Sequence, residues 1–200
     1  GTATRIIEQS DMKSKYAGII KFSENYEFAD SMDESGNNVR RCLARHSKLN
    51  VMDPKNPDEV LTEFNVPYGA NIFISDGDSI KAKTRLFQWD PYTDIILARQ
   101  TGTVNLKDFD EGETFQVEAV EGGKKQMVVI ESKDRRLSPH IELTDKDGNV
   151  LAGGTILPVG ATLVVSDKQN VVRGQTLVKI QKDIGKTRDI TGGLPRVAEL

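Results

Sequence analysis

Short runs of apolar residues alternate with polar residues from Tyr16 to about residue 186, and turn-forming residues separate the runs. Runs rich in β-branched and aromatic residues, repeated roughly every 8–12 residues, are typical of strands in a sandwich or barrel. The clearest predicted strands span residues 17–22, 39–46, 49–52, 60–64, 126–131 and 141–144. Helical periodicity is nearly absent from 15 to 186, so we predict an all-β fold.

Turn chemistry marks the boundaries between these strands. Residues 53–58 contain two prolines, which preset φ for tight turns. We predict hairpin turns over residues 109–113 and 121–125. The Asp147-Gly148 pair within residues 145–149 is a typical signal for a hairpin tip.

The chain also contains an internal repeat. Residues 66–86 align without a gap on residues 157–177, an offset of 91 residues, and residues 17–22 resemble 101–106 in the same way. The identical pairs include Pro67/Pro158, Gly69/Gly160, Ala70/Ala161, Ser75/Ser166, Asp76/Asp167 and Leu86/Leu177. Internal repetition indicates one structural unit used more than once. We therefore predict two tandem β modules over 15–97 and 98–186, with a linker over 1–14 and a separate segment over 187–200.

Composition narrows the class of protein. Hydrophobic residues make up 37% and charged residues 28% of the chain, which indicates modest cores beneath a polar surface. The apolar run Met127–Ile130 is far too short to cross a bilayer, and no signal peptide is visible. The single cysteine, Cys42, cannot form an internal disulfide, so we expect a reducing, cytoplasmic environment. The net charge of −3 argues against coating nucleic acid as the main task.

We find no convincing catalytic or metal-binding constellation in the sequence. His46 and His140 are isolated, and Cys42 with His46 would supply only two ligands where structural zinc takes four. Residues 145–149 begin like a calcium loop but lack the carboxylate that would complete coordination. No nucleophile elbow or phosphate-binding loop is present. We therefore expect no catalytic residue, metal or cofactor in this chain.

Two basic clusters are candidates for a nucleic-acid interface. The first consists of Arg40, Arg41, Arg45 and Lys48, and the second of Lys133, Arg135 and Arg136. On a strand, Arg41 and Arg45 would project to the same face. Such charges would favour a phosphate backbone. No aromatic residues alternate with them, so a solvated or salt-bridged surface is the competing interpretation.

The only tryptophan lies near the predicted boundary between the modules. Trp89 and Tyr92 belong to the segment 88–92, just before the second module. We predict that both pack at the module junction. An anchor for a partner protein is the alternative, because aromatic residues are enriched at binding hot spots.

The last residues have the features of a hinge followed by the start of a helix. Gly192 and Gly193 permit unusual backbone angles, and Pro195 suits the first helical turn. Residues 196–200 favour a helix but are too few to form a stable one, so a frayed tail is the alternative.

The segment 191–200, Thr-Gly-Gly-Leu-Pro-Arg-Val-Ala-Glu-Leu, resembles the C-terminal arm of the trigger loop in β′, the largest catalytic subunit of bacterial RNA polymerase. Residues 1–3 resemble the end of the opposite arm. Some bacterial lineages carry an insertion of tandem sandwich-barrel hybrid motif modules between these arms. The middle of this chain resembles that insertion more loosely, through residues 66–70, 89–91, 157–158 and 174–177.

This resemblance implies a regulatory insertion that modulates trigger-loop folding, and hence elongation, pausing and transcript cleavage. It implies no catalysis by the fragment, although the parent subunit belongs to a nucleotidyltransferase that binds magnesium and zinc elsewhere. The implied partners are the rest of β′, the β, α, ω and sigma subunits, DNA and RNA through the complex, and transcription factors at the secondary channel, with no membrane. Gly192, Gly193 and Pro195 would form the hinge and helix start, and Arg196 would make contacts in the parent.

Two other functions remain open at this point. One alternative is a free-standing protein-binding β-sandwich module, for which residues 187–200 would be unrelated to any polymerase arm. A carrier resembling biotinyl or lipoyl domains needs a modified lysine at a hairpin tip, and Lys168 is the only candidate. Its counterpart in the first repeat is Gly77, so a plain turn also explains this position. For an inserted domain we expect the two ends to lie close together.

Overall fold

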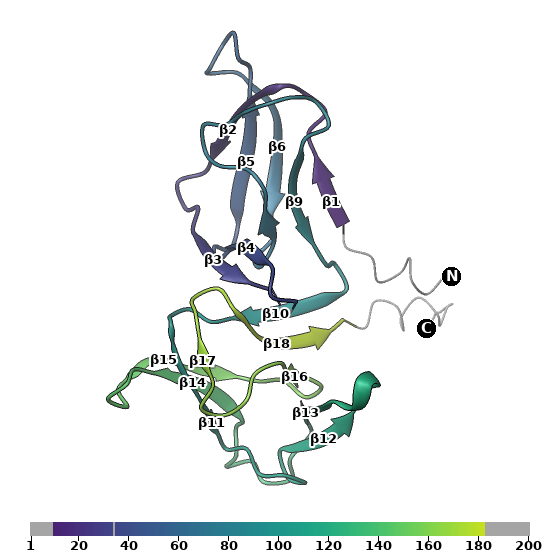
Figure 1. Ribbon diagram of the computed structural model, residues 1–200, viewed down its shortest axis with the longest axis vertical. Coiled ribbons are helices and arrows are strands. Elements are labelled where there is room, and N and C mark those ends of the chain that lie inside the picture. The colour runs from purple at the N-terminus through teal and green to yellow at the C-terminus, as the bar shows by residue number, and fades with distance from the viewer. Residues whose placement is uncertain (1–9, 34, 183–200) are drawn as a thin grey trace.

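The computed structural model describes residues 10–33 and 35–182, which form two β modules stacked end to end (Figure 1). Antiparallel strands in four sheets account for the regular structure of these residues. The one helical element within them is a short 3-10 turn over Glu121–Gly123. The prediction of an all-β chain is therefore confirmed.

Nine strands form the first module. They are β1 (Ser10–Lys13), β2 (Gly18–Phe22), β3 (Phe28–Met32), β4 (Asn38–Cys42), β5 (Ser47–Met52), β6 (Val60–Val66), β7 (Asn71–Ile72), β8 (Ser79–Ile80) and β9 (Arg85–Trp89). One sheet has the strand order β1-β9-β7-β4-β3 and the other has the order β6-β5-β2-β8. Buried side chains from both sheets, including Ile20, Leu49 and Phe87, form one core between them.

Nine strands form the second module in the same way. They are β10 (Thr93–Leu97), β11 (Gly102–Lys107), β12 (Phe115–Ala119), β13 (Lys125–Val129), β14 (His140–Thr144), β15 (Val150–Ile156), β16 (Thr162–Leu163), β17 (Asn170–Val171) and β18 (Thr176–Gln181). Its sheets have the orders β10-β18-β16-β13-β12 and β15-β14-β11-β17, which repeat the first module strand for strand. A separate core includes Val104, Leu163 and Val178. The repeat seen in the sequence therefore extends to the whole topology.

The repetition reaches individual hydrogen bonds. The Asp76 carboxylate accepts a hydrogen bond from the Phe22 amide at 2.8 Å, and Asp167 accepts one from the Leu106 amide at 2.9 Å. These aspartates follow matching serines in the two repeats. Each one ties the turn before β8 or β17 to the neighbouring inner strand, β2 or β11, which explains why the same residue occurs twice.

The strand boundaries differ from the predicted ones at several places. The strand β1 lies within residues 1–14, where we expected a linker. The strand β10 lies within the range expected for the first module, but it pairs with β18. By strand pairing, the modules are joined at residues 90–92. The prediction of a continuous strand over 39–46 is wrong, because β4 ends at Cys42 and His46 has a positive φ of 63°.

One predicted hairpin is also absent. Residues 109–113 connect β11 to β12, which belong to different sheets, so this segment crosses between sheets. The other two predictions are confirmed, because β12 pairs with β13 and β14 pairs with β15 across residues 121–125 and 145–149.

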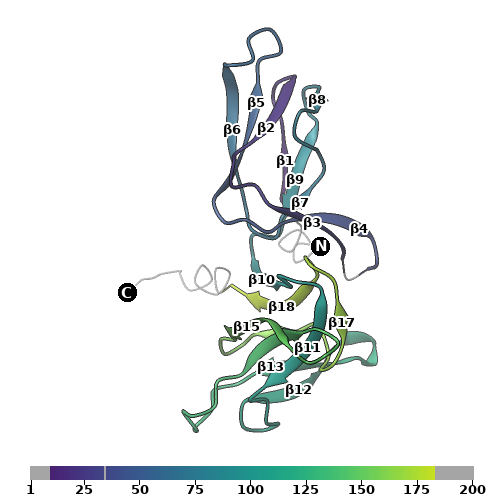
Figure 2. The same cartoon turned by 90° about the vertical axis from the view of Figure 1, so that its left-hand side faces the viewer.

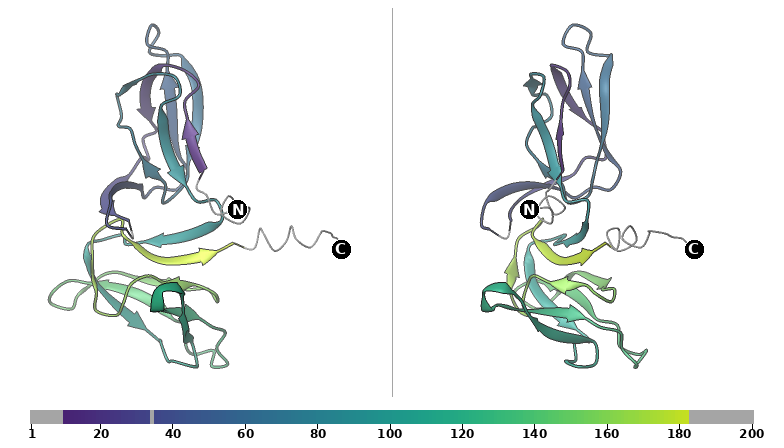
Figure 3. Two further views of the ribbon diagram at one scale, coloured as in Figure 1. Left: turned by 45° about the vertical axis from the view of Figure 1, so that its right-hand side comes forward. Right: turned by 90° about the vertical axis from the view of Figure 1, so that its right-hand side faces the viewer.

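The contact between the modules involves particular strands. The paired strands β10 and β18 lie at the top of the second module, facing the first (Figures 1 and 2). The first module places β3 and β4 and the segment around Tyr68 on the opposite side of this contact. Figure 3 shows that β1 begins and β18 ends beside it. We call this region the waist. It consists of the linker 90–92, the strands β10 and β18 of the second module, and β3, β4 and the segment around Tyr68 of the first.

No helix within residues 10–33 and 35–182 has the length and apolar character needed to cross a membrane.

Candidate functional site

The first and last described residues each pair with a residue beside the linker at the waist. Ser10 lies opposite Trp89 in the β1–β9 ladder, and the Lys182 amide donates a hydrogen bond to the Tyr92 carbonyl oxygen at 2.9 Å. Only residues 90 and 91 separate these two partners in the chain. The Asp90 carboxylate accepts a hydrogen bond from the Tyr92 amide at 2.8 Å and so shapes the linker locally. Entry and exit of the chain are thus anchored to one short segment.

The modules contact each other through two groups of residues. In the first group, the Leu97 amide donates a hydrogen bond to the Tyr68 hydroxyl oxygen at 3.1 Å. Gly69 packs against Ile95 so closely that a Cβ at this glycine would lie 2.5 Å from the Ile95 Cδ1 atom. A side chain at residue 69 would therefore push the modules apart.

The second group centres on Arg173. Its guanidinium donates a hydrogen bond to the Phe28 carbonyl oxygen at 3.0 Å and forms an ion pair with Glu27. The next residue, Gly174, is buried, has a φ of +91°, and approaches Ala29 so closely that a Cβ would lie 2.9 Å from the Ala29 Cβ. This turn of the second module is thus fitted directly onto β3 of the first.

The two repeats differ where the modules touch. At the repeat offset of 91 residues, Gly174 corresponds to Lys83, which has a positive φ of 72° despite its side chain. Tyr68 corresponds to Val159, which is 62% exposed. Lys83 and Val159 are both exposed and line neither of the cavities between the modules. The shared topology does not require Tyr68 or Gly174, because the other repeat has different residues at these positions. Their contacts with the other module explain why they occur in one repeat only.

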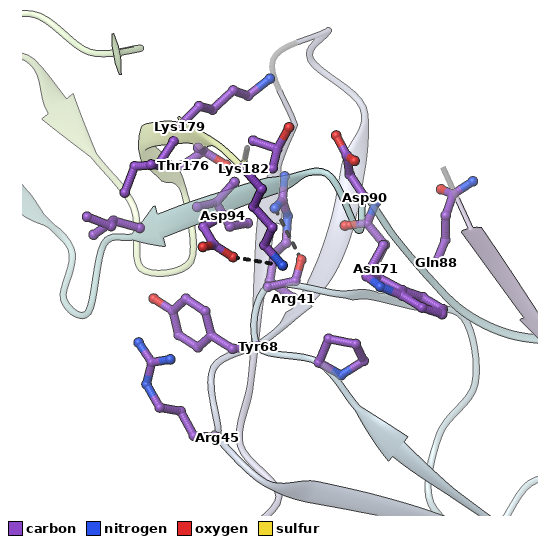
Figure 4. Close-up of a pocket in the computed structure, with 17 residues that line it drawn as sticks. Arg41, Arg45, Tyr68, Asn71, Gln88, Asp90, Asp94, Thr176, Lys179 and Lys182 are labelled. Atoms are coloured by element: carbon purple, nitrogen blue, oxygen red, sulfur yellow. Dashed lines mark hydrogen bonds and ion pairs between the residues drawn. The ribbon is translucent and has the colours of Figure 1, made fainter. Parts of the chain in front are cut away.

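Two cavities are lined by residues of both modules. The first has a volume of about 490 Å³ and is shown in Figure 4. The second has a volume of about 540 Å³. Tyr68 and Arg45 line both cavities, and the Arg45 guanidinium lies 4.5 Å from the centre of the Tyr68 ring. This stacked pair is therefore part of the lining of both cavities.

The predicted basic residues fall in two places. Arg41, on β4, is buried and donates a hydrogen bond to the Gly69 carbonyl oxygen at 3.3 Å, whereas Arg45 is exposed in the turn after β4. Both line the first cavity, although they do not share one strand as expected. Arg135 and Arg136 lie far along the chain in the segment between β13 and β14, and neither lines a waist cavity.

The Arg135 and Arg136 segment is itself locally ordered. Arg136 forms an ion pair with Asp134 at 3.0 Å, and this arginine holds the pKa of the Asp134 carboxyl below its usual range. Both arginines remain exposed. The structure thus places the second predicted cluster in the second module, apart from the waist.

The predicted junction aromatics occupy the ends of the linker. Trp89 packs against Phe87 of the first core, with ring centroids 5.6 Å apart, and also lines the first cavity. Tyr92 contributes its backbone through the bond to Lys182.

The predicted hinge and helix-start residues, Gly192, Gly193, Pro195 and Arg196, lie outside the described residues.

The side chains considered for chemistry are held in structural roles. Cys42 is fully buried, and burial raises the pKa of its thiol. Lys168 has a positive φ of 69° and its ammonium contacts the Asn105 side-chain oxygen, as expected for a turn residue. Within 10–33 and 35–182, no three histidine, cysteine or acidic side chains are grouped so that they could hold a metal ion.

Sequence reasoning missed Tyr68, Arg173 and Gly174 as contact residues. The available signal was the set of differences between the repeats. The pair Tyr68/Val159 lies between the identical pairs Pro67/Pro158 and Gly69/Gly160. A change inside an otherwise repeated turn indicates a role that only one copy has.

The chain is similar in sequence to one region of known proteins. No family model matches the chain. It is 37% identical over its full length to the protein named DNA-directed RNA polymerase subunit beta' from Parabacteroides distasonis, 37% identical to that from Porphyromonas cangingivalis and 36% identical to that from Salinibacter ruber. The matched region covers all of this chain but only 14%, 17% and 14% of these relatives. The chain therefore belongs, as a homologue of one segment of the subunit, to the β′ family of bacterial DNA-directed RNA polymerase.

Proposed function

We propose that this chain is an inserted body in the trigger loop of the β′ subunit, where it modulates loop folding and thereby elongation, pausing and transcript cleavage. The observation that carries the proposal is the adjacency of the two described ends, at Ser10–Trp89 and Tyr92–Lys182. A body whose two ends lie beside one short segment can be inserted into a host loop at little cost in loop-closure entropy.

The proposed mechanism is a change in a conformational equilibrium. The trigger loop of this family alternates between an open loop and a helical hairpin. A body attached at the waist biases that equilibrium only through contacts that differ between the two states. A bias of about 1.4 kcal/mol would change the ratio of the two states tenfold.

The contacts between the modules support transmission through a firm body. The Arg173 and Tyr68 hydrogen bonds and the close approach of Gly174 to Ala29 connect two separate cores. A body joined in this way moves as a unit, so contacts made by either module reach the host loop. Two freely hinged modules would transmit little.

In this proposal the chemistry belongs to the rest of the polymerase. Nucleotide addition, with the magnesium and zinc implied for the parent subunit, would take place outside this chain. The proposed partners are the rest of β′, the β, α, ω and sigma subunits, DNA and RNA in the same complex, and factors at the secondary channel. The proposed setting is the cytoplasm.

The experiment is deletion of residues 10–182 from the complete polymerase, with a short glycine-serine link in their place. We expect nucleotide addition to persist, while elongation rate, pause duration and transcript cleavage change. If all three remain at their original values, the proposal is wrong.

A second deletion separates the size of the body from closure of the loop. Removing residues 90–182 leaves the first module with Ser10 and Trp89 still paired, so the host loop remains closed at the same place. We expect an effect that differs from both the complete deletion and the intact enzyme. An effect identical to that of the complete deletion would assign the modulation to the second module.

A further inference from the structure

The waist is positively charged although the whole chain has a net charge of −3. Its two cavities are lined by six basic side chains and only three acidic ones. The basic residues are Arg41, Arg45, Arg99, Arg173, Lys179 and Lys182, and the acidic residues are Glu27, Asp90 and Asp94. Basic side chains are therefore concentrated where the modules meet, although acidic residues outnumber basic ones in the whole chain.

The acidic residues do not neutralise all of this charge. Glu27 already pairs with Arg173, and Asp94 pairs with Lys182 at 3.3 Å. Within the described parts of the chain, neither Arg45 nor Arg99 has a carboxylate partner, and both are exposed. Both line the cavity of about 540 Å³, Arg45 from the first module and Arg99 from the second.

The same cavity has apolar walls. Half-buried Leu43 and Ile96 and buried Leu97 line it beside the two arginines. We call this cavity the Arg45–Arg99 groove. Guanidinium groups bind carboxylates through paired hydrogen bonds, and the apolar walls suit aliphatic side chains.

We propose that the Arg45–Arg99 groove binds an acidic segment of a protein partner, with carboxylates at the arginines and apolar side chains against Leu43 and Ile96. This goes beyond modulation of the loop, because it assigns a binding surface and the chemistry of its occupant. An occupant would contact both modules. It would therefore favour the same relative position of the modules that the Arg173 contacts with Glu27 and Phe28 stabilise.

Protein fits this groove better than nucleic acid does. Arg45 covers the Tyr68 ring at 4.5 Å, and the Tyr68 hydroxyl accepts the Leu97 amide, so that ring face is not free to stack on a base. Aliphatic walls contribute nothing to phosphate binding. Binding of a phosphate backbone also requires many contacts between basic side chains and phosphates. The two unpaired arginines of this groove supply too few of them.

The test is fluorescence anisotropy with the 200-residue chain and a labelled probe of about eight residues that alternates glutamate with leucine, which supplies both carboxylates and aliphatic side chains. We expect binding that weakens about tenfold in the variant Arg45→Ala/Arg99→Ala, which loses two charge-assisted contacts. The control variant Arg135→Ala/Arg136→Ala has the same change in charge outside the groove and should bind within about twofold of the original chain.

Two further measurements complete the test. A probe with glutamine in place of glutamate should bind at least about tenfold more weakly, because it lacks the carboxylates. The variant Arg45→Lys/Arg99→Lys, which keeps the charge without the planar guanidinium, should recover part of the binding. Unchanged thermal unfolding of every variant separates loss of binding from loss of fold.

Three outcomes would overturn the proposal. They are absence of binding by the glutamate probe, equal losses in the groove and control variants, and tighter binding of a single-stranded oligonucleotide that depends on Arg45 and Arg99. None of these outcomes bears on the deletion experiment, which measures the polymerase and does not use a probe.

Discussion

The Lys182 backbone amide donates a hydrogen bond to the Tyr92 carbonyl oxygen at 2.9 Å, which places the end of β18 beside the linker between the modules. On the other side of that linker, Ser10 is paired with Trp89. The two described ends of a body with two separate cores are therefore both held beside the linker between its modules. Both modules project from this point, so a movement at the waist displaces each of them.

The Arg173 contact should control how firmly the modules are joined. The variant Arg173→Ala removes the hydrogen bond to Phe28 and the ion pair with Glu27. We expect a loss of about 1 kcal/mol in unfolding free energy, because both partners sit near solvent. The distance distribution between spin labels introduced by Lys55→Cys and Lys146→Cys should broaden.

The matched control for this change is Arg136→Ala. It removes an arginine–aspartate pair within the second module and leaves the waist intact. The distance distribution should then keep its original width. Equal distributions in Arg173→Ala and the original chain would show that Arg173 does not join the modules.

Gly174 should tolerate alanine less well than Gly77 does. Both glycines have a positive φ, but nothing lies within 4 Å of a Cβ at Gly77, whereas one at Gly174 meets Ala29 at 2.9 Å. We expect Gly77→Ala to cost about 1 kcal/mol through backbone strain alone. Gly174→Ala should cost about 2 kcal/mol or more, because overpacking adds to that strain. Urea unfolding measures both, and equal costs would contradict the close contact.

The paired aspartates should contribute similar stability to their modules. Asp76→Ala leaves the Phe22 amide without its acceptor, and Asp167→Ala does the same to the Leu106 amide. We expect each variant to lose about 1–3 kcal/mol in unfolding free energy. The losses should add in the double variant, since the sites lie in separate cores. A large loss of unfolding free energy in only one of the two variants would show that the two hydrogen bonds do not contribute equally to their modules.

The β14–β15 hairpin should weaken in acid. The backbone amide and side chain of Asn149 donate to the Asp145 carboxylate and hold its pKa below the usual range. Since the folded-state pKa is the lower one, this contribution is complete above the unfolded pKa of about 4 and is lost as pH falls through the folded value.

Thermal unfolding from about pH 6 to about pH 2.5 tests this dependence. The original chain should lose more stability over that range than Asp145→Asn, whose amide oxygen can still accept hydrogen bonds but does not titrate. Parallel curves for the two proteins would assign the acid sensitivity to other carboxylates.

Cys42 should be chemically inert in the folded chain. Its side chain is fully buried, the Sγ atom donates a hydrogen bond to the Ala44 carbonyl oxygen at 3.4 Å, and burial raises the thiol pKa. Only the thiolate reacts readily with a disulfide reagent. Modification by such a reagent should follow the rate of unfolding in denaturant, and rapid modification in native buffer would contradict the buried position.

Local rules account for the features that the sequence predicted well. Asp147-Gly148 marks the β14–β15 tip, because these residues favour the backbone angles of a tight turn. The repeated Asp76 and Asp167 mark one motif used twice, because each side chain accepts a bond from its own module. Predictions that depended on a strand's distant partner differ from the structure. The strand β10 pairs with β18 of the second module, and residues 109–113 connect two different sheets.

The sequence by itself determined that this is an all-β chain built from two copies of one unit, because residue alternation and turn chemistry act between neighbours along the chain. Only the tertiary structure decided that β10 joins the second module, that Arg173 reaches β3, and that the two described ends pair with Trp89 and Tyr92. These features depend on contacts between residues some 80 to 150 positions apart, and they form only once the sheets have assembled and their cores are packed.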